Sequence, residues 1–139
     1  MLAYTVPRDP SACRVYVWRK LKKLGAVAVQ DAVWVLPSTP HTLEQYRWLA
    51  AEIAEMDGEA SVWEARQLLD GQDQALVNAF SALVEGPYRA ILSALRKRKP
   101  DLSALSRQYQ QTLALDYFRC AMGRKVRDAL VAAEGGMER

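Results

Sequence analysis

Basic residues beside aromatic side chains are the feature of this sequence with the clearest chemistry. One cluster lies within residues 16–23 and combines two aromatic with four basic residues: Tyr16, Trp18, Arg19, Lys20, Lys22 and Lys23. A second cluster is the run Arg96, Lys97, Arg98 and Lys99. Such clusters attract phosphate groups by charge, without base specificity. These basic residues are therefore the candidate nucleic-acid-binding residues of the chain.

Both clusters also have a purely structural explanation. At about 100° per residue, the four basic residues of the first cluster spread over roughly 160° of a helix, centred opposite Val17 and Leu21, as on any solvated helix face. Basic residues at the end of a helix also stabilise its dipole. The sequence alone leaves both explanations open.

The other reactive residues give little support for catalysis. His41 is the single histidine, and Cys13 and Cys120 are far apart without the spacing of a metal or redox motif. The motifs of P-loop, dinucleotide-binding, zinc-protease and serine-hydrolase sites do not occur. We expect a protein that is not an enzyme and that has neither a cofactor nor a bound metal.

Three charged residues are predicted to be structural polar groups of the core. Arg14 lies about 100° from Cys13 on the predicted helix, on the side that packs, so it needs a hydrogen-bonding partner. Asp9, in the preceding loop, is the nearest candidate, and ligand contact is the alternative. Asp116 interrupts an apolar helical pattern, and an ion pair with Arg119 or another arginine is more expected than catalysis.

Charge is distributed unevenly along the 139 residues, although the net charge is only +3. Residues 1–40 carry six basic and two acidic groups, residues 41–85 carry two and nine, and residues 86–139 carry eleven and five. Folding could bring the two basic ends onto one face, or the acidic middle could simply neutralise them. Half of the residues are hydrophobic, which is enough for a core.

The expected location is the cytoplasm. The first ten residues lack the charged and apolar regions of a signal peptide, and no apolar run approaches the length of a membrane span. Two cysteines without a framework spacing fit reduced thiols. We therefore expect no membrane association.

The first 68 residues predict an α+β domain with the order β-α-β-β-α-β, which is the ferredoxin-like arrangement. A strand at 2–6 precedes a helix that runs from Ser11 to Leu24 and stops at Gly25. Two apolar runs turn at Gln30 and Asp31 as a hairpin. A second helix starts at Thr39 and ends at residues 57–58, and residues 59–68 form the last strand.

Residues 69–139 predict an antiparallel helical hairpin that packs as one unit with this domain. The first helix covers 75–95 and is broken or kinked at Gly86 and Pro87. After the turn at 96–101, an apolar stripe continues from Leu102 to Val131 and predicts a second, long helix.

The chain resembles the N-terminal domain of the chromate-resistance regulator (ChrB-type) family. The resemblance rests on Pro7, Arg14, the segments 17–19, 24–26 and 33–37, and the motifs "YRWLAAEI" and "GEASVWEA". "GPYRAIL" and "LALDYF" match more loosely. The segments 14–25 and 29–34 are remotely similar to the middle domain of phenylacetate-degradation (PaaX-type) repressors and to small ferredoxin-like proteins of CRISPR spacer acquisition.

The resemblance implies a DNA-binding transcriptional regulator of chromate resistance, with double-stranded DNA as its partner. We expect the chain to form a homodimer. The second, chromate-linked domain of these regulators has no counterpart in these residues, so an oxyanion effector stays an open question. A non-catalytic interaction or dimerisation module is the alternative. A metal-dependent nuclease is the third, and it is disfavoured because Thr5 stands where the CRISPR proteins carry a metal-binding aspartate at the end of the first strand.

Overall fold

The computed structural model describes residues 1–7 and 11–137, with side chains described as far as residue 135. The chain divides into two compact units, Met1–Asp73 and Gln74–Arg139, which we call the N-terminal unit and the helical unit. The boundary lies a few residues after the predicted one at residue 68. That the two parts pack as one unit stays a prediction.

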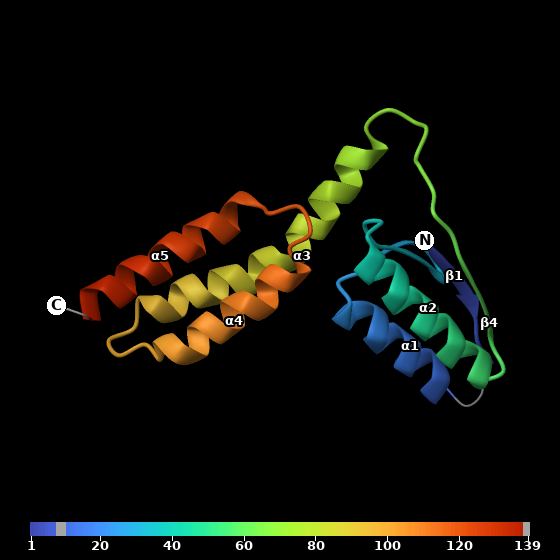
Figure 1. Cartoon of the computed structure of the whole chain (residues 1–139), viewed down its shortest axis with the longest axis horizontal. Coiled ribbons are helices and arrows are strands. Elements are labelled where there is room, and N and C mark those ends of the chain that lie inside the picture. The colour runs from blue at the N-terminus through green and yellow to red at the C-terminus, as the bar shows by residue number, and fades with distance from the viewer. Residues whose placement is uncertain (8–10, 138–139) are drawn as a thin grey trace. The chain divides into compact units, whose positions relative to one another are not determined.

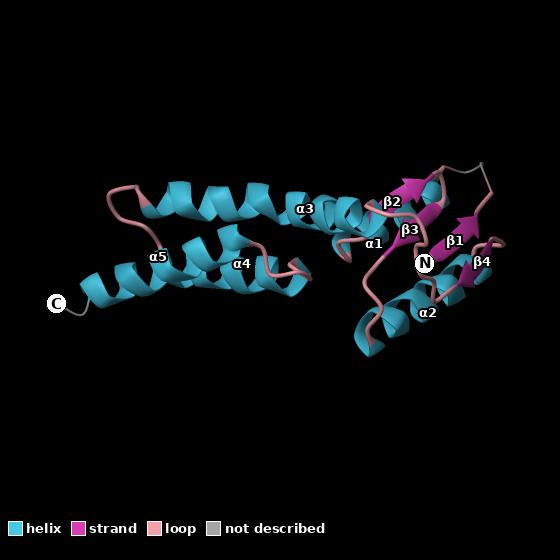
Figure 2. Ribbon diagram, turned by 90° about the horizontal axis from the view of Figure 1, so that it is seen from above, coloured by secondary structure: helices cyan, strands magenta, loops and turns pink. Residues whose placement is uncertain are grey.

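The N-terminal unit has an α+β fold, as predicted. Its elements are β1 (Leu2–Thr5), α1 (Ala12–Lys23), β2 (Val27–Gln30), β3 (Val33–Val35), α2 (Pro40–Glu55) and β4 (Glu59–Val62). The strands form one antiparallel sheet in the order β2-β3-β1-β4 (Figure 2). Each helix therefore connects two strands that have a third strand between them: α1 passes over β3, and α2 passes over β1.

A single apolar core joins the sheet to both helices. Leu2 of β1 and Trp34 of β3 are directly paired across the sheet and point to the same face. That face is covered by buried side chains of the two helices, which are Val17, Leu21, Tyr46, Leu49 and Ile53. Both helices therefore lie on one side of the sheet (Figure 1).

Local signals fix the helix ends of this unit. Gly25 adopts a φ of 75° and ends α1, as predicted. Thr39 caps α2 by accepting a hydrogen bond from the Thr42 N–H, and Pro40 occupies the first helical position. The predicted last strand was too long, because the strand ends at Val62. Trp63 still exchanges backbone hydrogen bonds with Met1, at 2.7 and 2.8 Å, and residues 64–68 have no strand structure.

The helical unit contains three helices rather than the predicted two. α3 (Gln72–Leu95) begins at the end of the N-terminal unit, and α4 (Leu102–Leu115) and α5 (Ala121–Met137) follow. Their core consists of Val84, Tyr88, Ile91, Leu105, Val126 and Leu130. None of the helices in the described ranges is long and apolar enough to cross a membrane.

The predicted break or kink at Gly86 and Pro87 does not end the helix, and a break that the sequence did not predict lies further along the chain. α3 continues through Pro87, which we attribute to Gly86: without a Cβ, the residue before proline is spared part of the clash that disfavours helix there. The apolar stripe from Leu102 instead breaks at residues 116–120, where Arg119 has a φ of 50°. The side chain of Asp116 holds this break by accepting hydrogen bonds from the Cys120 N–H, at 3.1 and 3.2 Å.

Candidate nucleic-acid interface

The basic residues of α1 do not form one uniform surface. Lys20 lies with its Nζ 5.6 Å from the centre of the Tyr16 ring. The Tyr16 hydroxyl in turn donates a hydrogen bond to Glu52 of α2. Lys20 is half-buried and belongs to the seam between the two helices. Its charge therefore lies close to a carboxylate and is less available to a phosphate.

Lys22 lies on the opposite flank of α1, beside two tryptophans. Its Nζ is 5.6 Å from the centre of the Trp18 ring and 5.8 Å from that of Trp34. These are cation–π distances, and Trp18 itself is 50% exposed. Arg19 and Lys23 are exposed on the outer face. The four α1 basic residues thus point in three directions. Lys22 is exposed, as are Arg19 and Lys23, but its charge lies beside the two tryptophan rings.

The second cluster is a compact, exposed group of charges. Arg96, Lys97, Arg98 and Lys99 lie between the end of α3 and the start of α4, and all four are exposed. We call these four residues the basic turn. The backbone N–H groups of Arg96 and Lys97 bond to the carbonyls of Ser93 and Ala94, which fixes the start of the turn.

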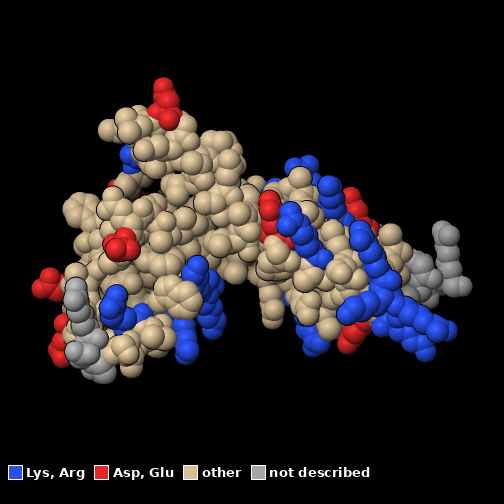
Figure 3. Space-filling view, turned by 180° about the vertical axis from the view of Figure 1, so that it is seen from behind, with Lys and Arg blue, Asp and Glu red and all other residues tan. Residues whose placement is uncertain are grey.

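The helical unit carries further exposed cations. They are Arg89, Arg107, Arg119, Arg124, Lys125 and Arg127. On the face drawn in Figure 3, Lys and Arg side chains are spread over this unit. Within the described parts of the chain, the one salt bridge joins Arg89 to Glu85, at 3.6 Å. The cations of the basic turn are therefore not neutralised by an ion pair with a described residue, as a phosphate-binding surface requires.

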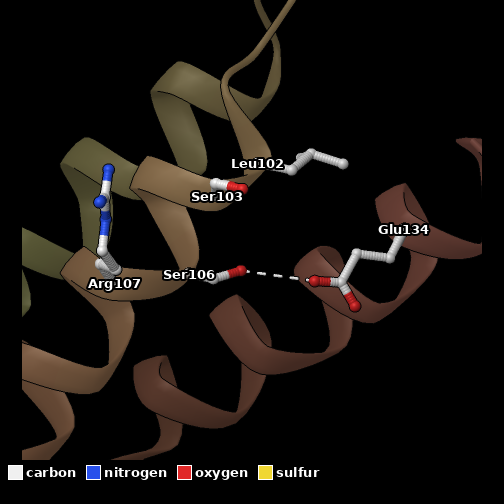
Figure 4. Close-up of a pocket in the computed structure, with 5 residues that line it drawn as sticks. All are labelled: Leu102, Ser103, Ser106, Arg107 and Glu134. Carbon is white, nitrogen blue, oxygen red and sulfur yellow. Dashed lines mark hydrogen bonds between the residues drawn. The ribbon is translucent and has the colours of Figure 1, made fainter.

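A shallow pocket of about 500 Å³ lies between α4 and α5. It is lined by Leu102, Ser103, Ser106, Arg107 and Glu134, and we call it the α4–α5 pocket (Figure 4). The Ser106 hydroxyl donates to Glu134 Oε1 at 3.4 Å, a long hydrogen bond. The Arg107 side chain points away from Glu134. None of these residues was predicted as a site, and the spacing of Ser103 and Arg107 by one helical turn was the available signal.

Arg14 was wrongly predicted to lie toward the core. It is exposed, because α1 buries only the narrow stripe of Val17 and Leu21, and the core does not extend to the turn that holds Arg14. Burial raises the pKa of Tyr4, and the nearby Arg14 charge partly opposes that shift. Its predicted partner Asp9 lies outside the described residues.

Asp116 is buried, with only 3% of its surface exposed. The Tyr88 hydroxyl donates to its Oδ2 at 2.9 Å, and the Cys120 thiol approaches the same oxygen at 3.6 Å. The expected arginine partner is absent among the described residues, since Arg119 donates instead to the Leu113 carbonyl at 3.3 Å. Asp116 therefore ties α3 to the break between α4 and α5.

The surroundings of Asp116 favour protonated neighbours. Burial, and then the hydrogen bond to Asp116, raise the pKa of Tyr88 above its usual value. Burial also raises the pKa of the Cys120 thiol. A thiol kept protonated is a poor nucleophile and a poor metal ligand. The cluster of Asp116, Tyr88 and Cys120 therefore has a structural role, since its hydrogen bonds connect α3 to the break between α4 and α5.

The remaining reactive residues are scattered. His41 is exposed and Cys13 is half-buried. Among the residues that the structure describes, no group of three or more His, Cys, Asp or Glu side chains could hold a metal ion.

Comparison with known proteins identifies the family. Residues 14–116 match the family described as "Protein ChrB, N-terminal". The chain is 34% identical over 76 residues to Protein ChrB of Cupriavidus metallidurans, a match that covers 54% of this chain and 23% of that protein. The match thus spans about a quarter of the relative's length, and no solved structure matches. Because the family match covers well over half of its residues, the chain belongs to the ChrB N-terminal domain family.

Proposed function

We propose that this chain binds duplex DNA through phosphate contacts, as the DNA-binding part of a chromate-resistance regulator. The observation that carries the proposal is the basic turn, four adjacent and exposed cations within a chain of the ChrB N-terminal family. Phosphate contacts of this kind supply affinity and orientation but little sequence preference. The family supports a regulatory role, and the exposed charge supports nucleic acid as the partner.

The two basic clusters are expected to contribute unequally. In the basic turn all four side chains are exposed and close in sequence. On α1, Lys20 and Lys22 lie against aromatic rings, so mainly Arg19 and Lys23 remain for phosphates. We therefore propose the basic turn as the main contact and α1 as an auxiliary one.

The test is duplex binding as a function of salt. The logarithm of the association constant for a mixed-sequence DNA duplex should fall linearly with the logarithm of salt concentration, by about 0.9 per phosphate contact. Changing Arg96, Lys97, Arg98 and Lys99 together to Gln should lower this slope more than the same change at Arg19, Lys20, Lys22 and Lys23. A flat plot for the wild-type chain would refute DNA binding.

The fold of the N-terminal unit, the oligomeric state and the cellular location are part of the same proposal. We propose that the N-terminal unit is ferredoxin-like, supported by a strand order in which α1 and α2 each cross one intervening strand. We also propose a homodimer in the cytoplasm. Sedimentation of the purified chain over a range of concentrations tests the dimer, and a single monomeric species throughout would count against it.

A protein-interaction module is the second candidate function. It is favoured by large apolar side chains left exposed in the N-terminal unit: Trp48 is 61% exposed, Trp63 is 56% exposed and Leu68 is 82% exposed. Replacing the four α1 basic residues by Gln should then leave partner binding unchanged. If the variant instead lost its partner, the α1 charges would be needed for binding, as the nucleic-acid function requires.

A further inference from the structure

We propose that the α4–α5 pocket binds one backbone phosphate of the nucleic acid, with Arg107 and Ser103 as its principal donors. This inference rests on the proposed DNA binding and assigns part of it to a specific site. Arginine guanidinium and serine hydroxyl groups are among those that make most protein contacts to DNA phosphates. Arg107 can also give two parallel hydrogen bonds to one phosphate, which fixes its orientation.

The spacing of the donors suits a single anion. Ser103 and Arg107 are separated by one turn of α4 and therefore lie on the same side of that helix. Ser106 borders the same pocket. In Figure 4 the Arg107 guanidinium points away from the Ser103 hydroxyl, so a phosphate bound by both requires the Arg107 side chain to turn toward Ser103, a rotamer change that leaves the path of the helix unchanged.

The charge of Arg107 is available to a ligand. Arg107 is exposed, and its side chain is directed away from Glu134, the acidic residue of the pocket (Figure 4). Within the described residues, Glu134 accepts its hydrogen bond from Ser106, and no salt bridge involves Arg107. A phosphate at the Arg107 side thus meets a cation that is not already paired.

The pocket follows the basic turn closely in sequence. Leu102, a lining residue, is the first residue of α4 and follows the turn by only two residues, Pro100 and Asp101. The Asp101 side chain is engaged in capping, since it accepts a hydrogen bond from the Ala104 N–H at 3.2 Å. One phosphate in the pocket and its neighbours along the strand at the basic turn would form a single contact track on the helical unit.

A change at Glu134 should alter the affinity for duplex DNA in the opposite direction to changes at Arg107 and Ser103. Its carboxylate lies on the far wall and repels an anion, so it confines the phosphate to the side of Ser103 and Arg107. Glu134→Gln removes this repulsion while keeping the size of the side chain. It should strengthen duplex binding, whereas changes at the donors should weaken it.

The experiment measures binding of a mixed-sequence DNA duplex to the full chain over a salt series. Arg107→Gln should weaken binding about tenfold and lower the salt slope by about 1. The double variant Ser103→Ala/Ser106→Ala should weaken binding without lowering the slope, because it removes no charge. The control is Arg47→Gln, which removes an equal charge from an exposed site on α2 and should change neither quantity.

The outcomes separate this inference from the proposed function. If the wild type binds with a steep slope but Arg107→Gln behaves like Arg47→Gln, the pocket is refuted and DNA binding stands. If Arg107→Gln weakens binding but the serine and Glu134 variants do not change it, Arg107 acts outside the pocket, and the inference is also refuted. If the wild type shows no salt dependence, the proposed function fails and the pocket assignment fails with it.

A titration with inorganic phosphate distinguishes the source of the anion. The backbone amide resonances of Ser103, Ser106 and Arg107 should shift and saturate in the wild type but not in Arg107→Gln. Phosphate-induced shifts together with unchanged duplex binding in Arg107→Gln would assign the pocket to free phosphate and refute the nucleic-acid form of the proposal. Far-UV circular dichroism of each variant verifies that the helices are retained.

Discussion

The two units of this chain differ in the polar and charged groups that they bury. The N-terminal unit has an apolar core, and its buried polar residue Thr42 is part of the capping box of α2. The helical unit instead buries the carboxylate of Asp116 and carries exposed cations in its basic turn. In the first unit, packing and capping account for the fold. In the second, the hydrogen bonds of Asp116 also determine where α4 ends and α5 begins.

The distribution of tryptophan allows this contrast to be measured. All four tryptophans, Trp18, Trp34, Trp48 and Trp63, lie in the N-terminal unit. Tryptophan fluorescence therefore reports on that unit, whereas far-UV circular dichroism is dominated by the helices of both. If the two units unfold separately, a change that affects one unit should move one signal more than the other, whereas coincident transitions in every variant would support the prediction that the two parts pack as one unit.

Asp116→Ala should have the largest effect, a loss of roughly 3 kcal/mol in the free energy of unfolding of the helical unit. The change leaves the Tyr88 hydroxyl and the Cys120 N–H without their acceptor inside the protein. Urea unfolding followed by circular dichroism measures it. The tryptophan signal should shift little.

The matched control is Asp128→Ala, which removes an exposed carboxylate of α5. It should change the free energy of unfolding by less than about 0.5 kcal/mol. If Asp116→Ala were equally mild, the polar tie would not stabilise the unit, and the contrast between the two units would disappear.

Gly58→Ala should destabilise the N-terminal unit, and not the helical unit, by about 2 kcal/mol. A Cβ at Gly58 would lie 2.5 Å from the Thr5 carbonyl oxygen and 2.8 Å from Ile53 Cγ2. The clash is with backbone, so either β1 or the start of β4 must move. The tryptophan transition should shift to lower urea concentration.

Gly135→Ala provides the comparison in the helical unit, since no atom lies within 4 Å of its Cβ position. In a helix this substitution should be neutral or stabilise by up to about 1 kcal/mol. Equal destabilisation by both substitutions would show that the close approach at Gly58 does not determine the result.

The elements that could be predicted from sequence are those set by neighbouring residues. Gly25 ends α1, and Thr39 with Pro40 starts α2, because each signal acts on its own stretch of backbone. The break between α4 and α5 could not be predicted. Asp116 lies within a continuous apolar pattern, and its effect depends on Tyr88, which is 28 residues away.

The candidate site was predicted only in part. The basic turn is a visible run in the sequence, and it is exposed. The α4–α5 pocket depends on Glu134 meeting Ser106 across two helices, which no local spacing reveals. Arg14 was misplaced because a helical projection gives the direction of a side chain but not how far along the helix the core extends.

Tyr88→Phe should cost the helical unit about 1 kcal/mol at neutral pH by removing one hydrogen bond to Asp116. It should also change the pH dependence. The pKa of Tyr88 is raised in the folded chain, so above pH of about 10 the unfolded chain releases the phenol proton first and wild-type stability falls. In Tyr88→Phe this fall should be shallower.

Urea unfolding at a series of alkaline pH values provides the measurement. Tyr117→Phe is the comparison within the same unit, because burial also raises the pKa of Tyr117. It should flatten the alkaline fall less than Tyr88→Phe does, since burial and the carboxylate act together on Tyr88. An identical alkaline fall in Tyr88→Phe and wild type would show that the Tyr88 proton is not held by the fold.

Lys22→Gln should have the smallest effect, a loss of about 0.5 kcal/mol in the N-terminal unit, because it removes contacts with the Trp18 and Trp34 rings. Lys23→Gln is the matched control, an exposed neighbour in the same last turn of α1. It removes the same charge near the same helix end, so any difference between the two reports on the rings. A larger loss of duplex affinity in Lys23→Gln than in Lys22→Gln would show that Lys22 stabilises the fold and Lys23 contacts DNA. Equal effects of the two changes on both unfolding and duplex binding would place both lysines on one solvated face.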